Sequence, residues 1–143
     1  MSSVSDLHPE EYTLEFLNER RIGDLAKRMG ILVTEFSEAH IIATMPVEGN
    51  TQAFGIMHGG AYVVLGELLG SIHANMFAPE GKFAVGVDVN ATHTASANQG
   101  LVTAVCAPVH LGNSMTVHDI AITDADGKRC STVRITNFYR PLL

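Results

Sequence analysis

The feature that most constrains the fold is an apolar run that begins at a pair of glycines, Gly59-Gly60, and continues to Met76. From Ala61 it reads AYVVLGELLGSIHANM, which is longer than a usual strand and apolar on nearly every face of a helix. A helix that is apolar all round is buried. We therefore expect one central helix over residues 59–76, surrounded by the rest of the chain.

Strand-like segments flank this run on both sides. Two of them precede it, and four with apolar alternation of period two follow it. The expected strands are 31–37, 39–47, 83–89, 101–110, 115–123 and 129–139, with a hairpin turn at Asp124-Ala125-Asp126-Gly127. The sequence lacks the strand–helix alternation of a parallel sheet. It predicts an α+β fold, an antiparallel sheet wrapped around one long central helix.

The N-terminal residues 8–28 are expected to be helical. His8-Pro9-Glu10-Glu11 resembles a helix start with acids in the first turn, and the apolar stripe would be Tyr12, Phe16, Leu17 and Leu25. Gly23 is expected to divide the segment into two short pieces. We interpret residues 1–143 as one domain with an N-terminal helical extension, 1–28, that covers a sheet edge or an oligomer surface.

Composition excludes several classes of function. The 143 residues are 46% apolar with a net charge of −6, which favours a globular domain and disfavours binding to nucleic acid. Glu67 interrupts the best candidate for a membrane span, and the N-terminus lacks the pattern of a signal peptide. We expect a cytoplasmic protein in which Cys106 and Cys130 are reduced core thiols, without a metal site.

Glu67 is the only carboxylate in the apolar run, and no Lys or Arg accompanies it there. A carboxylate in apolar surroundings is costly unless hydrogen bonds or a function retain it. The Gly59-Gly60 pair opens the helix, where free N–H groups can stabilise a developing negative charge. An oxyanion donor and a potential nucleophile or base thus lie close in sequence, which indicates acyl-transfer chemistry.

The same residues carry a family resemblance. Gln52, His58-Gly59-Gly60, Glu67 and Ser71 resemble, in type and spacing, the site of hotdog-fold acyl-CoA thioesterases related to 4-hydroxybenzoyl-CoA and 1,4-dihydroxy-2-naphthoyl-CoA thioesterases. The resemblance spans nearly all of residues 30–140. It includes VDVNATH, from Val87 to His93, and VHLGNS, from Val109 to Ser114.

The resemblance implies a role for each residue. Glu67 would attack the thioester carbonyl or activate water, the Gly59 N–H would polarise the carbonyl, and Ser71 would hold the water. Gln52 would orient the thioester and His58 would support the loop. Coenzyme A would contact Gly60, Phe54, Asn90, His93, Gly112, Asn113 and Ser114. No metal or organic cofactor is implied.

The chain departs from the family pattern where relatives often carry cations for the phosphates of coenzyme A. These places hold Thr94 and Ala95 after His93, and Asn113 and Ser114 after Gly112. The acyl pocket is expected near Phe54, Leu68 and Ile72. Its apolar walls suit an aromatic or medium aliphatic acyl group, and the subgroup favours an aromatic one.

The spacing of Gly59 and Glu67 predicts an oligomer. Eight residues on one helix separate them by about 12 Å along its axis, so both cannot contact one carbonyl carbon within a chain. A second copy of the helix, packed antiparallel, would bring Glu67 of one chain to Gly59 of the other. We expect a homodimer with shared sites, and the association of two dimers into a homotetramer.

Other readings stay open at this point. Glu67 could be a structural acid bonded to buried backbone or to Tyr62, and His58 could simply cap the helix. The fold also serves hydratases or dehydratases of acyl thioesters, for which His58 and Glu67 supply the residue types. A third alternative is a non-catalytic acyl-CoA binding module.

Overall fold

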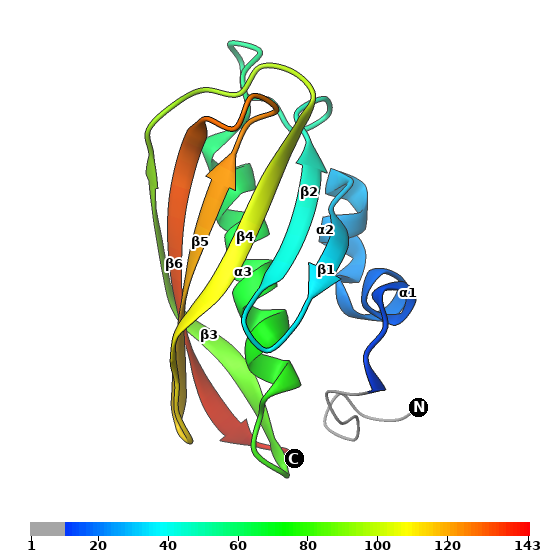
Figure 1. The fold of residues 1–143 in the computed structure, drawn as a ribbon, viewed down its shortest axis with the longest axis vertical. Coiled ribbons are helices and arrows are strands. Elements are labelled where there is room, and N and C mark those ends of the chain that lie inside the picture. Colours follow the sequence, from blue (N-terminus) through cyan, green and yellow to red (C-terminus); the bar gives the residue numbers. More distant parts are fainter. Residues whose placement is uncertain (1–10) are drawn as a thin grey trace.

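The computed structural model describes residues 11–143 and contains six strands and one long helix. The strands are β1 (Leu32–Phe36), β2 (Ile41–Pro46), β3 (Lys82–His93), β4 (Leu101–Leu111), β5 (Met115–Thr123) and β6 (Arg129–Pro141). They form one sheet in the order β1-β2-β4-β5-β6-β3, and every neighbouring pair is antiparallel. The long helix, α3 (Gly59–Met76), packs along one face of that sheet (Figure 1). This is the expected α+β hotdog arrangement.

Close backbone approach holds α3 against the sheet. A Cβ added at Gly66 would lie 2.6 Å from Val133, and one at Gly70 would lie 2.2 Å from Ile135, both on β6. These distances leave no room for a side chain, so the two glycines let the helix sink onto the strand. The inward face of β5 meets the helix with alternate buried residues, including Ile120 and Ile122.

The helix is not buried all round, which corrects the expectation from its composition. Its sheet side is fully packed, with Leu65 and Leu69 at 0% exposure. On the opposite side Val64 and Leu68 are half-buried and Glu67 is exposed. An apolar helix with one uncovered side is typical of a helix that packs against a further surface.

The N-terminal segment differs most from its prediction. It comprises a helical turn, α1 (Leu14–Phe16), a π-helical turn, η3 (Leu17–Arg21), and a short helix, α2 (Gly23–Met29). Gly23 divides it as expected, with φ +78°, but Leu25 is exposed rather than part of the apolar stripe. The predicted helix start at residues 8–10 lies outside the described residues. The segment lies at the β1 side of the sheet, beside α3 (Figure 1).

The other local predictions are confirmed within a few residues at each end. The Asp124–Gly127 turn forms as predicted, because the Asp124 carboxylate accepts from the N–H groups of Asp126 and Lys128 while Gly127 takes φ +83°. Cys106 and Cys130 are both buried and free. Among residues 11–143, no helix is long and apolar enough to cross a membrane.

Candidate functional site

Hydrogen bonds of Asn50 position the loop that precedes α3. The Asn50 side-chain amide donates to the carbonyl oxygens of Met29 (2.7 Å) and Pro46 (2.8 Å). The Asn50 carbonyl accepts from the N–H of His58 at 2.9 Å, and the N–H of Met57 donates to Ala97 O at 2.8 Å. The two residues before the helix, Met57 and His58, are therefore fixed to Asn50 and to the β3–β4 loop before any ligand binds.

His58 caps the helix, as one of the open readings had it. Its backbone is extended, with φ −63° and ψ 131°, and its Nδ1 accepts from the N–H of Gly60 at 2.8 Å. Within residues 11–143 the N–H of Gly59 has no acceptor. Capping thus satisfies the second glycine and leaves the first N–H available for a ligand oxygen.

His93 lies over the same helix end. A Cβ at Gly59 would stand only 2.8 Å from His93 Nε2, so the imidazole packs against the glycine and would have to move to admit a side chain there. His93 Nδ1 is 2.9 Å from the Ser131 hydroxyl, and its ring is 5.3 Å from that of Tyr62. The structure therefore brings His58, Gly59, Gly60 and His93 together.

Glu67 lies two helical turns further on and is exposed, which differs from the apolar burial expected of it. It has no hydrogen bond or ion pair within residues 11–143, so neither Tyr62 nor buried backbone holds it as a structural acid. Its carboxylate oxygen is 3.4 Å from the position of a Cβ on Gly86. There β3 is bulged between Gly86 and Asp88 and leaves a hollow of about 180 Å³.

Ser71 lies one turn beyond Glu67 on the same side of α3. Its hydroxyl donates to Asn137 Oδ1 at 3.3 Å. Glu67 and Ser71 together line a second hollow of about 350 Å³ between α3 and the N-terminal segment. An unpaired carboxylate and a hydroxyl thus share one hollow, an arrangement that can hold and deprotonate water.

Gln52 and Phe54 lie on the loop before the helix. The Gln52 side-chain oxygen accepts a short hydrogen bond from the N–H of Phe54, within the loop itself. Phe54 is 89% exposed and is not among the residues that line the hollows beside Leu68 and Ile72. Within one chain, therefore, these two residues do not meet the expected acyl pocket.

The residues expected at coenzyme A divide between the two ends of the molecule. Gly112, Asn113 and Ser114 form the β4–β5 turn, where Ser114 O accepts from the N–H of Tyr139. The Tyr139 hydroxyl reaches Ala74 O at 2.8 Å, so this turn lies at the far end of α3 from Gly59. Asn90 is exposed in the middle of β3, opposite Arg134.

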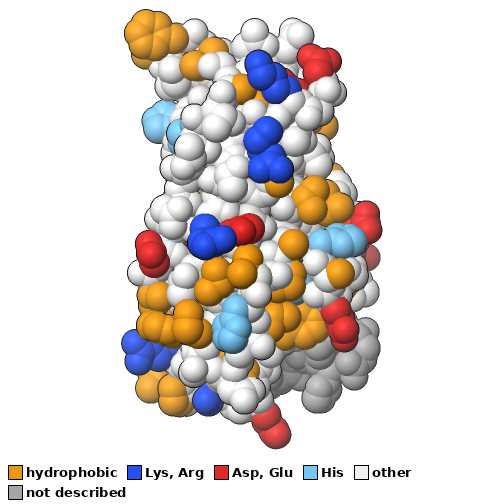
Figure 2. Space-filling model, turned by 60° about the vertical axis from the view of Figure 1, so that its left-hand side comes forward, with side chains coloured by type: hydrophobic (Ala, Val, Ile, Leu, Met, Phe, Trp, Pro, Cys, Tyr) orange, Lys and Arg blue, Asp and Glu red, His pale blue; other side chains and the backbone are white. Residues whose placement is uncertain are grey.

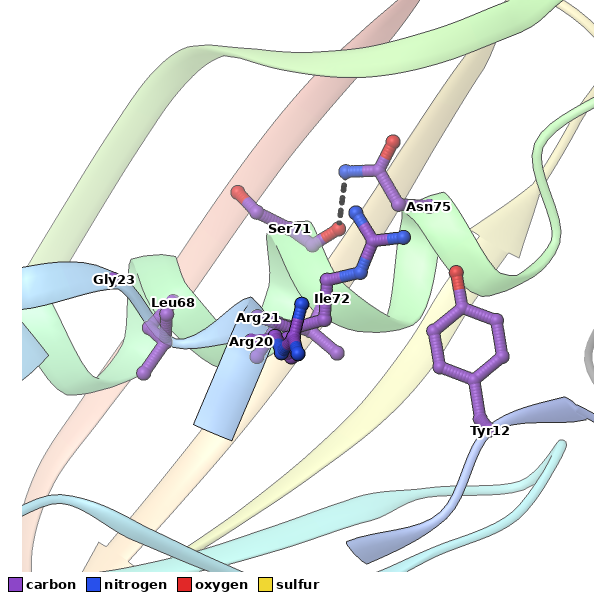
Figure 3. Close-up of a pocket in the computed structure, with 8 residues that line it drawn as sticks. All are labelled: Tyr12, Arg20, Arg21, Gly23, Leu68, Ser71, Ile72 and Asn75. Carbon is purple, nitrogen blue, oxygen red and sulfur yellow. Dashed lines mark hydrogen bonds between the residues drawn. The ribbon is translucent and has the colours of Figure 1, made fainter. Parts of the chain in front are cut away.

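The structure adds site residues that sequence reasoning missed. A cavity of about 310 Å³ separates the N-terminal segment from α3 (Figure 3). Its walls are Tyr12, Arg20, Arg21 and Gly23 on one side and Leu68, Ser71, Ile72 and Asn75 on the other. The available signal was the Arg20-Arg21 pair, which lies directly beside the apolar stripe.

Comparisons with known proteins agree with this geometry. The family model described as Thioesterase superfamily matches residues 54–131. A relative from Cronobacter sakazakii, described as proofreading thioesterase EntH, is 39% identical over 125 residues, or 87% of this chain and 91% of the relative.

Two solved structures are similar along nearly the whole chain. A thioesterase from Haemophilus influenzae superposes with a TM-score of 0.89 at 38% identity and covers 96% of both chains. A variant of a thioesterase from Pseudomonas aeruginosa superposes with a TM-score of 0.88 at 34% identity and covers 98% of this chain and 100% of that one.

Proposed function

The chain belongs to the thioesterase superfamily and hydrolyses thioesters, and we propose that its substrates are acyl-CoA thioesters, which it cleaves to the free acid and coenzyme A. The observation that carries the proposal is that one helix presents, on its uncovered side, a Gly59 N–H and a Glu67 carboxylate that both lack a partner among residues 11–143. The apolar side chains of Leu68 and Ile72 suit an aromatic or aliphatic acyl group.

The proposed site is shared between two protomers. Gly59 and Glu67 are about 12 Å apart along α3, which is too far for one carbonyl carbon. An antiparallel partner helix, packed on the uncovered side, supplies the missing group to each site. The Gly59 N–H of one protomer then polarises the thioester carbonyl, and Glu67 of the other attacks it or deprotonates a water.

Supporting residues act around these two groups in the proposed site. His58 fixes the helix start, which keeps the Gly59 N–H directed at the substrate. Ser71, one turn from Glu67, holds the hydrolytic water, and Gln52 orients the thioester. The oxygen of Glu67, or of the water it deprotonates, bonds to the carbonyl carbon, the C–S bond breaks, and the coenzyme A thiolate takes up a proton. The proposed reaction uses no metal or organic cofactor.

Coenzyme A is proposed to use residues from both ends of the fold. His93 and Gly60 lie at the start of α3, whereas Gly112–Ser114 lie at its far end. An antiparallel dimer brings the far end of one protomer to the helix start of the other. Hydroxyl, amide and N–H groups, with Asn90, would then bind the nucleotide in place of the cations that relatives often carry.

The decisive experiment is thiol release from a panel of aromatic and aliphatic acyl-CoA thioesters. We expect Glu67→Gln to lower turnover by at least the 10²–10³-fold typical of losing one oxyanion donor. Glu80→Gln, at an exposed acid just beyond α3, is the matched control and should retain parental turnover. Parental rates in Glu67→Gln would refute the assignment, and enoyl absorbance without thiol release would indicate a hydratase.

A further inference from the structure

The cavity beside the proposed site contains polar groups that no described residue satisfies. Tyr12 is only 6% exposed, yet its buried hydroxyl has no partner within residues 11–143. The Nε of Arg21 is likewise buried without an acceptor. Both side chains enter the cavity from the N-terminal segment, opposite α3 (Figure 3). Two donors therefore lack the acceptor that buried donors normally have.

Among the described residues, the Arg21 charge also has no matching anion in an ion pair. Its guanidinium lies 5.0 Å from the centre of the Phe16 ring, which holds it in place by a cation–π contact. The ion pairs Glu35–His40 and Asp119–Arg134 do not involve it. A half-buried cation is costly unless an anion accompanies it.

The protonation state of Tyr12 favours donation. Burial raises the pKa of its hydroxyl, and the nearby Arg21 charge opposes this only in part. The hydroxyl therefore stays protonated at neutral pH and can donate to an acceptor beside the guanidinium. A carboxylate satisfies both groups at once, because it offers two acceptor oxygens and one negative charge.

The cavity adjoins the hollow that contains Glu67, because Leu68 and Ser71 line both spaces. The two spaces, which lie along α3 from Glu67 to Asn75, are together called the acyl groove. That stretch of helix is about 12 Å long. An acyl group whose carbonyl is at Glu67 would pass the apolar side chain of Leu68 and bring its far end to Arg21.

We propose that this thioesterase favours acyl groups with a carboxylate at the end remote from the thioester, and that Arg21 binds this carboxylate with Tyr12 as second donor. The inference rests on the proposed acyl-CoA hydrolysis and specifies its substrate class. The middle of the acyl group, whether ring or chain, lies against Leu68 and Ile72. The remote carboxylate is not consumed in the reaction.

The experiment compares two substrates of equal length, octanoyl-CoA and the CoA monothioester of octanedioic acid. The readout is the ratio of their kcat/KM values, diacid over monoacid, measured by thiol release. We expect Arg21→Met to lower this ratio by about ten- to a hundredfold, since a hydrogen bond to a charged group has that worth. Tyr12→Phe should lower it less. Arg28→Met, at an exposed arginine of α2 outside the cavity, should keep the parental ratio.

A parental ratio in Arg21→Met, or an equal loss on both substrates, would overturn the inference while leaving acyl-CoA hydrolysis intact. A second measurement tests carboxylate binding independently of thioester hydrolysis. Free octanedioate should raise the Tm of the parent more than octanoate does, and Arg21→Met should abolish the difference. If neither thioester released thiol but this difference persisted, the proposed hydrolysis would fail and the carboxylate site would stand. Equal Tm shifts in parent and variant would refute the site.

Discussion

At the residue scale, the hydrogen bonds of two buried histidines fix which of their ring nitrogens carries a proton. His73 and His118 are both 0% exposed and are joined by a 2.9 Å contact between His73 Nδ1 and His118 Nε2. His73 Nε2 lies 3.0 Å from the Ser37 carbonyl oxygen, so that nitrogen must carry the proton. His73 Nδ1 then accepts, His118 Nε2 donates, and His118 Nδ1 is left as a buried acceptor.

This pair makes stability depend on pH. Burial lowers the pKa of His73, and burial together with His73 lowers that of His118 to about 4. The unfolded chain therefore binds more protons below its ordinary histidine pKa, and stability falls as pH drops from about 6.5 towards 4. We expect a loss of about 2 kcal/mol from His118 between pH 7 and pH 5, measured by urea unfolding.

The test variant is His118→Gln, which keeps an amide donor near His73 and removes the titrating ring. Its stability should change less between the two pH values than that of the parent. His110→Gln, at an exposed histidine, should keep the parental slope. An unchanged slope in His118→Gln would show that other groups cause the acid sensitivity.

For Glu67, the sequence predicted its distance from Gly59 but not its burial. Its identity and its distance from Gly59 were readable in the sequence, because residue spacing on a helix is fixed by geometry. Its surroundings were not readable, because an apolar run does not indicate whether each side of the helix is covered by the same chain or by another surface. The unpaired Arg21 was missed for a similar reason, since only the fold shows that it faces α3.

At the scale of elements, α3 is positioned by its contact with β6. Its bounds, Gly59–Met76, agree with the sequence prediction, since a glycine pair and a long apolar run mark both ends. The N-terminal segment was predicted less well. A π-helical turn inserts one residue into the helical period, so Leu25 rotates out of the apolar stripe. Propensity and periodicity do not report such an insertion.

We predict that Gly70→Ala destabilises the protein by about 1–3 kcal/mol, because the new methyl group would overpack a filled interface. The Cβ would clash with Ile135 Cγ2, so the helix or the Ile135 side chain must shift. Chemical denaturation of Gly70→Ala, Ile135→Ala and the double variant measures the effect. The double variant should lose less stability than the sum of the two single losses. Strict additivity would argue against this contact as the cause.

At the scale of the whole molecule, the exposed surface indicates assembly. One side of α3 is uncovered, and β4 exposes Val105 and Val109 on the opposite face of the sheet from its buried residues. Figure 2 shows hydrophobic side chains gathered over the lower half of one face of the molecule. We propose that the first surface forms a dimer and the second joins two dimers into a homotetramer.

Shared sites predict a specific result when two inactive variants are mixed. Glu67→Gln lacks the carboxylate. Gly59→Ala adds a Cβ that would meet His93 Nε2, so we expect the helix start or His93 to shift and thiol release to fall. In a mixed dimer one of the two sites contains neither change. Random reassociation of equal amounts should therefore restore about a quarter of parental thiol release. The two variants assayed separately are the controls, and a mixture no more active than these would place each site within one chain.

The position of the N-terminal segment has a consequence for how such proteins diversify. Residues 12–29 wall one side of the acyl groove, yet they belong neither to the six-stranded sheet nor to the region matched by the superfamily model, 54–131. The two residues proposed to bind the remote carboxylate, Tyr12 and Arg21, thus lie on a different element from Gly59 and Glu67. Substitutions at Tyr12 and Arg21 would therefore change which acids are released while Gly59 and Glu67 keep their positions.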